Sequence, residues 1–203
     1  MSQTLSECFE SNSNLHAAQS AYRKYHSTET AALSVFNDWR MALDKGCVVL
    51  VASLDVSAAF DTINHNILLG RLMETGVVGR AHKWFKSYLT NRTAVVRCGE
   101  EVSETYGLRS GVPQGSILGP ALFNVHMVNL AKMLEEIRHN LETICFNFQI
   151  YADDVLLYVW CRKEKIQDAI SILAEIILVV DNWMKENSLI LNPEKTELTI
   201  IRN

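Results

Sequence analysis

The chain has 203 residues, of which 48% are hydrophobic and 21% are charged, and its formal net charge is −4. This composition is typical of an ordinary globular protein with one sizeable domain or two small ones. The apolar runs are too short to cross a bilayer and the polar first residues lack a secretory signal, so we expect an intracellular protein that is not secreted and has no membrane partner. Five cysteines without a C-x-x-C pair exclude a zinc-finger pattern and a disulfide scaffold, and the net charge provides no basic footprint for nucleic acid.

The first predicted elements are a helix and a buried strand. Apolar side chains recur at three- and four-residue spacing over residues 26–43, after Ser27 or Thr28 as a cap, which predicts a helix. The continuous apolar run of residues 46–56 predicts a strand buried on both faces. Asp55 is the single charged residue of that run.

Residues 64–89 predict two short helices, with Gly76 and Gly79 at the break between them. Residues 93–110 then predict a hairpin that turns around Gly99. These elements lie between the first buried strand and the loop GVPQGSILGP.

The second half of the chain predicts two long helices and three strands. We expect a helix over residues 117–137, a hairpin over 146–160, an amphipathic helix over 166–184 and a strand over 192–201. Helices between buried antiparallel strands indicate an α+β fold, with a sheet that carries helices on one face.

Two adjacent carboxylates, Asp153 and Asp154, stand in the tetrapeptide YADD at the tip of the predicted hairpin. Aspartate is a common turn residue, so a solvated turn is one explanation. The other explanation is a metal site. If the strand that ends near Asp55 is a neighbour, three like charges converge, which is costly unless a cation lies among them. Ligands that are all oxygen favour Mg²⁺ or Mn²⁺ and suit two-metal phosphoryl or nucleotidyl transfer.

Four blocks of sequence occur in a set order, namely SLDVSAAFDTINH, GVPQGSILGP, YADD and NWMKENSLILNPEKTE. In this order they resemble the palm motifs of reverse transcriptases, specifically those of non-LTR (LINE-type) retrotransposons, and HSTETAALSVFNDW resembles the late fingers segment of that group. The resemblance covers residues 15–203. It implies an RNA-directed DNA polymerase with an α+β polymerase palm, a ferredoxin-like split βαβ antiparallel sheet with helices on one face, plus partial fingers.

The resemblance also implies roles for single residues. Asp55, Asp153 and Asp154 match the metal-binding and catalytic aspartates of the palm, and the backbone carbonyl of Val56 would complete the shell of Mg²⁺ (or Mn²⁺). Lys195 resembles the catalytic lysine near the triphosphate, which can donate a proton to the leaving pyrophosphate.

Further residues match nucleotide-binding positions of the family. Phe60 occupies the position used against a sugar 2′-hydroxyl, so the resemblance implies dNTP as substrate, and a plain core aromatic is the alternative. Gln114 and Gly115 resemble the pair beside the incoming nucleotide and the template. Arg23 and Lys24 stand where relatives often have an arginine-bearing loop, which implies triphosphate contacts.

Three other polar residues receive structural interpretations. We expect Asp61 to act as an N-cap, and His65 and His126 to be structural.

The resemblance suggests a division of the chain into 1–45 (partial fingers), 46–61 (palm, with the first metal aspartate), 62–112 (fingers insertion) and 113–203 (palm). The thumb is expected to be absent, together with the endonuclease of such polyproteins. Because a thumb supplies many phosphate contacts, its absence would explain the missing basic footprint. The implied partners are an RNA template, a DNA primer and dNTPs, and the implied compartment is nuclear or cytoplasmic.

Two hypotheses from different classes remain open. One is a reverse transcriptase, either a fragment or a weakly active remnant, and the other is a truncated, non-catalytic relic that persists as a small folded or interaction module. A diguanylate-cyclase-type palm is a third possibility for the sheet, but the GVPQG and NPEKTE blocks do not suit it.

Overall fold

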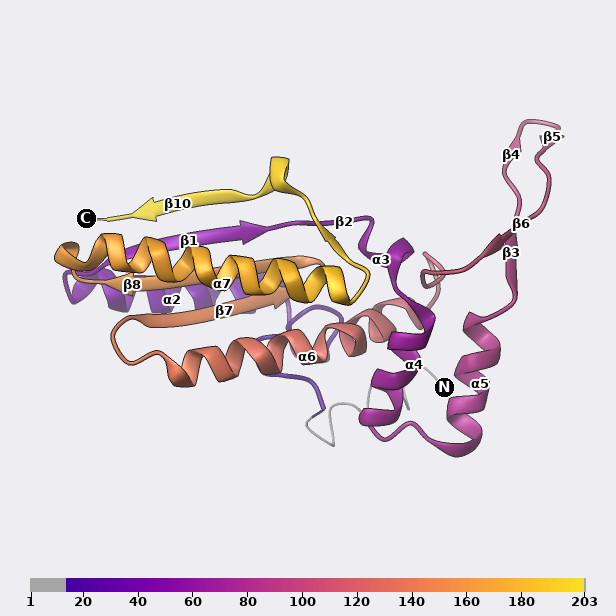
Figure 1. Cartoon of the computed structure of the whole chain (residues 1–203), viewed down its shortest axis with the longest axis horizontal. Helices are drawn as coiled ribbons and strands as arrows, with labels where there is room; N and C mark the ends of the chain where they lie inside the picture. Colours follow the sequence, from indigo (N-terminus) through magenta and orange to yellow (C-terminus); the bar gives the residue numbers. More distant parts are fainter. Residues whose placement is uncertain (1–13, 203) are drawn as a thin grey trace.

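A four-stranded antiparallel sheet lies at the centre of the computed structural model, which describes residues 14–202 (Figure 1). Cys8 and residues 1–13 of the expected fingers segment lie outside the described residues. The strands are β1 (Val48–Leu54), β7 (Cys145–Tyr151), β8 (Asp154–Cys161) and β10 (Glu197–Ile201). Their order in the sheet is β10-β1-β8-β7, so the hairpin β7–β8 and the last strand flank the first strand. This is the split βαβ arrangement of a ferredoxin-like fold, which confirms the predicted α+β class.

Two long helices cover one face of the sheet, as predicted. They are α6 (Gly119–Asn140) and α7 (Ile166–Glu186), the latter preceded by the short 3₁₀ turn η1 (Lys163–Lys165). The predicted stripe of α7 is largely buried, at Ala169, Leu173, Ile176, Val180, Trp183 and Met184. On β1 the side chains of Leu50, Ala52 and Leu54 pack into the same core. Alternate side chains of β1 and the apolar stripe of α7 therefore form one apolar layer between the sheet and the helix.

The opposite face of the sheet is covered by α2 (Thr28–Asp44), which Figure 1 shows behind the strands. Val35 of this helix packs with Val49, Val51 and Tyr158 in a second, smaller cluster. The helix begins as predicted, because the side chain of Ser27 accepts a hydrogen bond from the N–H of Thr30. The resemblance implies that this helix belongs to the partial fingers, and in the structure it packs on the sheet.

A segment before α2 lies beside the edge strand β7. Gln19 forms a parallel bridge with Ile150, and its side chain donates to the carbonyl of Asn124 at 3.0 Å. The buried side chain of Asn124 donates in turn to the carbonyl of Ala21 at 2.7 Å. These bonds pair buried polar groups that would otherwise destabilise the core.

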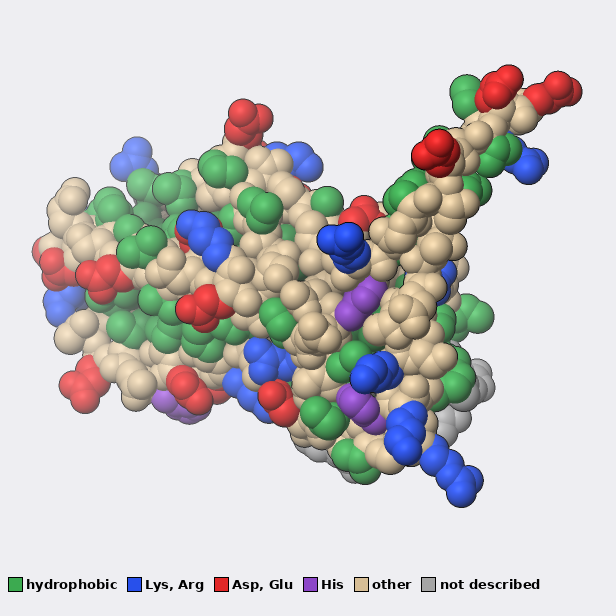
Figure 2. Space-filling view, turned by 45° about the vertical axis from the view of Figure 1, so that its right-hand side comes forward, with side chains coloured by type: hydrophobic (Ala, Val, Ile, Leu, Met, Phe, Trp, Pro, Cys, Tyr) green, Lys and Arg blue, Asp and Glu red, His purple; other side chains and the backbone are tan. Residues whose placement is uncertain are grey.

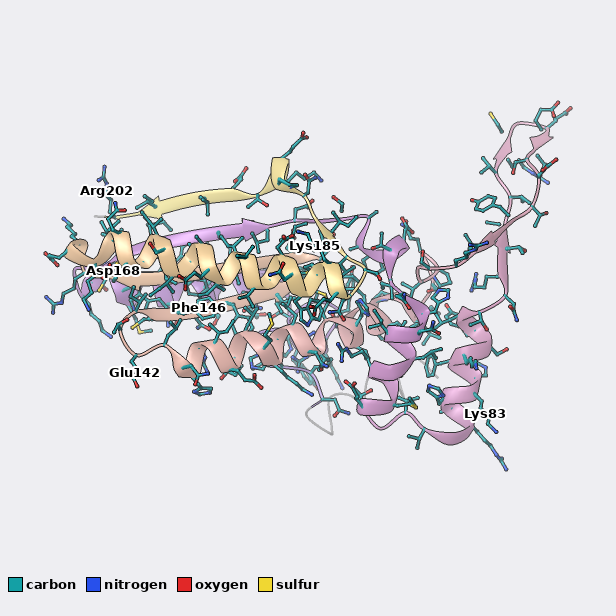
Figure 3. All side chains as sticks on the ribbon, viewed as in Figure 1. Lys83, Glu142, Phe146, Asp168, Lys185 and Arg202 are labelled. Atoms are coloured by element: carbon teal, nitrogen blue, oxygen red, sulfur yellow. The ribbon has the colours of Figure 1, made fainter. Side chains whose placement is uncertain are left out.

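The chain between β1 and α6 leaves the sheet and forms a separate group of elements (Figure 1). Its helices are α3 (Ala59–Thr62), α4 (His65–Glu74) and α5 (Gly79–Leu89). The two predicted helices are therefore confirmed, although Gly79 begins α5 and does not belong to the break. Figure 3 shows the side chain of Lys83 in α5 pointing away from the rest of the molecule.

A β-ribbon arm follows α5 and projects from the molecule (Figures 1 and 2). Its strands are β3 (Arg92–Ala94), β4 (Arg97–Cys98), β5 (Glu101–Val102) and β6 (Tyr106–Leu108). The strands β4 and β5 pair around Gly99 and Glu100, which confirms the predicted hairpin.

Among the described residues, no helix is both long and apolar enough to span a membrane.

Candidate active site

The YADD sequence forms the tight turn of the hairpin β7–β8. Tyr151 and Asp154 are the last residues paired across the hairpin, so Ala152 and Asp153 alone make the turn. Ala152 has a φ of 54°, a left-handed conformation that is strained for a residue with a Cβ. Such strained residues cluster at functional sites in proteins. The turn therefore places Asp153 at the tip of the hairpin, with Asp154 at the start of β8.

Pairing between β1 and β8 brings Asp55 to the same end of the sheet. The final pair in this register joins Leu54 to Val155. Asp55 directly follows Leu54, and Asp154 directly precedes Val155. The three predicted carboxylates thus lie at one end of two neighbouring strands, although they come from distant parts of the sequence.

The carboxylates influence each other electrostatically. Burial raises the pKa of Asp154 above its usual value, and the charges of Asp153 and Asp55 raise this pKa further, while Lys195 lowers it. The pKa of Tyr22 is also raised, first by burial and then by the charge of Asp153. Tyr22 therefore lies close enough to the turn to interact with it. No pattern in the sequence relates Tyr22 to the distant YADD block, so its proximity to the turn was not predicted.

Lys195 contacts the first of the carboxylates. Its Nζ lies 3.4 Å from Oδ2 of Asp55. It is placed there by β9 (Ile190–Leu191), which pairs with β2 (Val56–Ser57), and by the 3₁₀ turn η2 (Pro193–Lys195). The N–H of Asn192 donates to the carbonyl of Asp55 at 2.8 Å. The chain after β9 is therefore fixed against the end of β1.

The fit of these residues to a divalent cation is partial. The donor set suits Mg²⁺, since Asp55, Asp153 and Asp154 offer only carboxylate oxygens. Val56, whose backbone carbonyl is the other predicted ligand, directly follows Asp55 and pairs with Leu191 of β9. Over residues 14–202, however, no group of three or more His, Cys, Asp or Glu residues is arranged so that it could hold a metal ion. The positions of the side chains, with Asp55 bound to Lys195, do not form a closed ligand set.

Phe60 lies in α3 and packs on the core. Its ring stacks on that of Phe123 in α6, with centroids 4.7 Å apart and an interplanar angle of 23°. The ring is only partly buried. It can therefore contribute to the core and still present one edge to solvent.

Gln114 lies in the loop before α6 and contacts the α3 turn. Its Nε2 is 2.9 Å from both Oδ1 and Oδ2 of Asp61. Both residues line a cavity of about 550 Å³, which extends to Arg92 and Arg109 near the base of the arm. The neighbouring Gly115 has a φ of 74°, a conformation that glycine adopts without strain.

The structure corrects the interpretation of Asp61. The N-cap of α4 is Asn64, whose side chain accepts from the N–H groups of Asn66 and Ile67, and Asp61 lies inside the short α3. The carboxylate of Asp61 instead accepts a hydrogen bond from the side chain of Gln114. No spacing signal could have revealed this contact, because the two residues are far apart in the chain.

The two histidines make backbone contacts. His65 donates from Nε2 to the carbonyl of Gly111 at 2.8 Å, and His126 donates from Nε2 to the carbonyl of Asn187 at 3.2 Å. His126 is fully buried in α6. These contacts agree with structural roles for both residues.

Arg23 and Lys24 lie in the loop before α2. The Nη1 of Arg23 donates to the carbonyls of His16 and Gln19, at 2.7 and 2.8 Å. The ammonium of Lys24 lies 5.0 Å from the ring centroid of Tyr25. Contacts of these side chains with a triphosphate stay a prediction.

A split βαβ sheet with helices α6 and α7 on one face is the fold of a polymerase palm. The chain belongs to the reverse transcriptase family, because the family model described as "Reverse transcriptase (RNA-dependent DNA polymerase)" matches residues 1–201. This confirms the family that the order of the four sequence blocks predicted.

Curated relatives come from mobile elements. The chain is similar to the probable RNA-directed DNA polymerase from transposon BS of Drosophila melanogaster, with 29% identity over 88% of the chain and 19% of the relative. It is also similar to the RNA-directed DNA polymerase from mobile element jockey of the same fly, with 28% identity over 87% of the chain and 19% of the relative. A third relative is the Pol polyprotein of the type-1 element R2 of Popillia japonica, with 26% identity over 95% of the chain and 26% of the relative. The chain thus spans about a fifth to a quarter of these relatives' length.

Solved structures support the fold. The chain resembles apo telomerase from Candida tropicalis, truncated from its C-terminal domain, with a TM-score of 0.73, 15% identity, and coverage of 100% of this chain and 40% of the telomerase. It also resembles Candida tropicalis telomerase in complex with a fragment of telomeric RNA, with a TM-score of 0.69, 14% identity, and coverage of 98% of this chain and 32% of the telomerase.

Proposed function

We propose that this chain is the catalytic core of a non-LTR-type reverse transcriptase, which adds dNTPs to the 3′-hydroxyl of a DNA primer on an RNA template. One observation supports this proposal above the others. The last pair of β1 and β8, Leu54 with Val155, is flanked by Asp55 and Asp154, so that carboxylates from two neighbouring strands lie at one end of the sheet beside Asp153.

The carboxylates define where the reaction would occur. Asp55, Asp153 and Asp154 would hold Mg²⁺, or Mn²⁺, with the backbone carbonyl of Val56. When bound, the cations would favour attack of the primer hydroxyl on the α-phosphate and stabilise the leaving pyrophosphate. The pKa of Asp154 is raised first by burial and then by the charges of Asp153 and Asp55, and a bound cation would relieve the repulsion among these carboxylates.

The other site residues would handle the nucleotide. Lys195 would donate a proton to the leaving pyrophosphate, and its contact with Asp55 brings it next to the carboxylates. Phe60 would exclude a ribose 2′-hydroxyl by its bulk. Gln114 and Gly115 would line the nucleotide site, and template base pairing would select the nucleotide.

The division of the chain stays part of the proposal. Residues 46–61 and 113–203 would form the palm, and residues 1–45 and 62–112 the partial fingers, with α2 as the part of the fingers segment that packs on the palm sheet. Arg23 and Lys24 would contribute to triphosphate binding from that segment. The relatives are several times longer, so the grip on the nucleic-acid duplex would come largely from other parts of such proteins.

The test is Mg²⁺-dependent incorporation of dNTPs on a primed RNA template. Asp153→Asn and Asp154→Asn should each lower the rate by at least about a hundredfold, because a neutral amide is a poor ligand for a hard cation. Asp168→Asn, which changes an aspartate in the first turn of α7, serves as a matched control and should keep the rate. A folded wild-type chain that incorporates nothing would overturn the proposal and support a non-catalytic relic.

A further inference from the structure

The α3 turn and the loop before α6 are joined by a side-chain contact. The amide nitrogen Nε2 of Gln114 lies 2.9 Å from each carboxylate oxygen of Asp61. Both side chains line the cavity of about 550 Å³ beneath the arm. The contact therefore lies in the wall of this cavity, and it holds Gln114, which is proposed to line the nucleotide site.

Two hydrogen bonds to backbone carbonyls also hold these segments together. The Ser110 hydroxyl donates to the carbonyl of Asp61 at 2.9 Å, and the N–H of Val112 donates to the carbonyl of Phe60 at 2.8 Å. Gly111 permits the close approach, since a Cβ at this position would lie 2.8 Å from the carbonyl oxygen of Asp61. These bonds already anchor the loop before α6. The contact between Gln114 and Asp61 is therefore not needed for that purpose, and it has a second effect.

That consequence is the orientation of an amide. A glutamine amide has one end that donates and one that accepts, and the two ends are similar in shape. A carboxylate only accepts, so it binds the NH₂ end and leaves Oε1 of Gln114 to face elsewhere. Hydrogen bonds to a charged acceptor are also stronger than those between neutral groups.

We infer that Asp61 is a positioning residue for Gln114, one that fixes the amide so that Oε1 is offered as an acceptor to a hydrogen-bond donor of the incoming nucleotide. This inference rests on the proposed function, and it names which atom of Gln114 contacts the substrate. Asp61 itself does not touch the nucleotide. Its effect should appear in nucleotide binding and not in the rate of the chemical step.

Steady-state kinetics on a primed RNA template test the positioning role. Asp61→Ala should raise KM for dNTP by about five- to tenfold, the scale of one hydrogen bond, with kcat nearly unchanged. Asp61→Asn should restore most of the affinity, since its Oδ1 can still accept from Nε2. In a Gln114→Ala background, Asp61→Ala should have no further effect, because two residues that act through one contact are not additive.

A second readout does not need activity. The side-chain NH₂ signals of Gln114 in ¹⁵N-correlated NMR spectra should shift in Asp61→Ala and stay in place in Ser110→Ala, which removes an anchor of the loop but keeps the carboxylate. Additive effects of the two alanine substitutions on KM, or unchanged NH₂ signals in Asp61→Ala, would overturn the inference. A wild-type chain that incorporates no dNTP would overturn the proposed function instead, while the NMR comparison still decides whether Asp61 orients Gln114.

Discussion

Lys195 forms an ion pair with Asp55, with 3.4 Å between Nζ and Oδ2. The two residues are brought together by η2, which follows the pairing of β9 with β2. The lysine therefore neutralises one member of the carboxylate group directly, and it also lowers the pKa of Asp154 against the effect of the neighbouring charges. This relationship makes Lys195 the residue whose substitution is most informative about the site.

Lys195→Ala should lower dNTP incorporation by about a hundredfold, the scale of a lost general acid. The free energy of unfolding should change by less than about 1 kcal/mol, because the lysine side chain is 66% exposed and exposed ion pairs contribute little. Primer extension and chemical denaturation measure the two quantities.

Lys185→Ala is the matched control for this substitution. Lys185 lies near the end of α7 (Figure 3), is similarly exposed, and pairs with Asp181, which is not one of the site carboxylates. It should leave incorporation unchanged. Equal losses in the two variants would argue against a catalytic role for Lys195.

Phe60→Val should relax discrimination against ribonucleotides. A smaller side chain leaves room for a 2′-hydroxyl, so the preference for dNTP over rNTP in kcat/KM should fall by about a hundredfold. The loss of the stack on Phe123 should also destabilise the fold by about 1–3 kcal/mol. Single-nucleotide incorporation with each substrate measures the preference.

Phe60→Tyr keeps the ring and should retain the preference. If Phe60→Val still prefers dNTP as strongly as the wild type, Phe60 is a core residue alone.

His126 should make the stability of the fold depend on pH. Burial lowers its pKa from 6.5 to about 4, and the charge of Arg71 lowers it too, against the opposing effect of the bond to Asn187. At a pH between about 4 and 6.5, His126 is therefore protonated in the unfolded chain but not in the folded chain. Stability is fully present above pH 6.5 and is lost as the pH falls toward 4, by about 3 kcal/mol from this residue.

His126→Gln keeps a donor for the carbonyl of Asn187 and cannot be protonated. Its free energy of unfolding, measured by urea denaturation between pH 4 and 7, should fall less at low pH than that of the wild type. Identical pH profiles would show that His126 does not cause the dependence.

Gly111→Ala should destabilise the fold more than Gly46→Ala. Both glycines have positive φ, 84° at Gly111 and 75° at Gly46, so each substitution introduces about 1–2 kcal/mol of backbone strain. A Cβ at Gly111 additionally meets the carbonyl of Asp61 at 2.8 Å, whereas a Cβ at Gly46 meets nothing within 4 Å. We expect a difference of at least about 1 kcal/mol between the two variants in thermal or chemical denaturation. Equal stabilities would contradict the close approach of the loop to α3.

The sequence was sufficient to predict the sheet and its helices, because each followed from a local pattern. The run of residues 46–56 is mostly apolar and largely buried, and the period of α7 is clear, so the predicted and the observed burial agree. The position of α2 on the second face was not predicted. Its stripe indicates that one side is buried, but a stripe does not say against which face of a sheet.

The site was predictable only in part. The order of the four blocks indicated that Asp55, Asp153 and Asp154 belong together, and the register of β1 with β8 brings them to one end. The electrostatic effect of Asp153 on Tyr22 and the contact of Asp61 with Gln114 depend on segments that are distant in the sequence and close in the fold. No pattern in a single sequence carries that information, and a capping signal at Asp61 pointed to a different role.

The central claim is that the carboxylates at the end of β1 and β8 hold a divalent cation, and binding of Mn²⁺ followed by electron paramagnetic resonance tests it most directly. The wild-type chain should bind Mn²⁺, and Asp55→Asn and Asp154→Asn should each weaken binding by about tenfold or more. Lys195→Ala should bind more tightly, because the ammonium group no longer competes for Asp55. Equal affinity in the wild type and in Asp55→Asn would contradict the account.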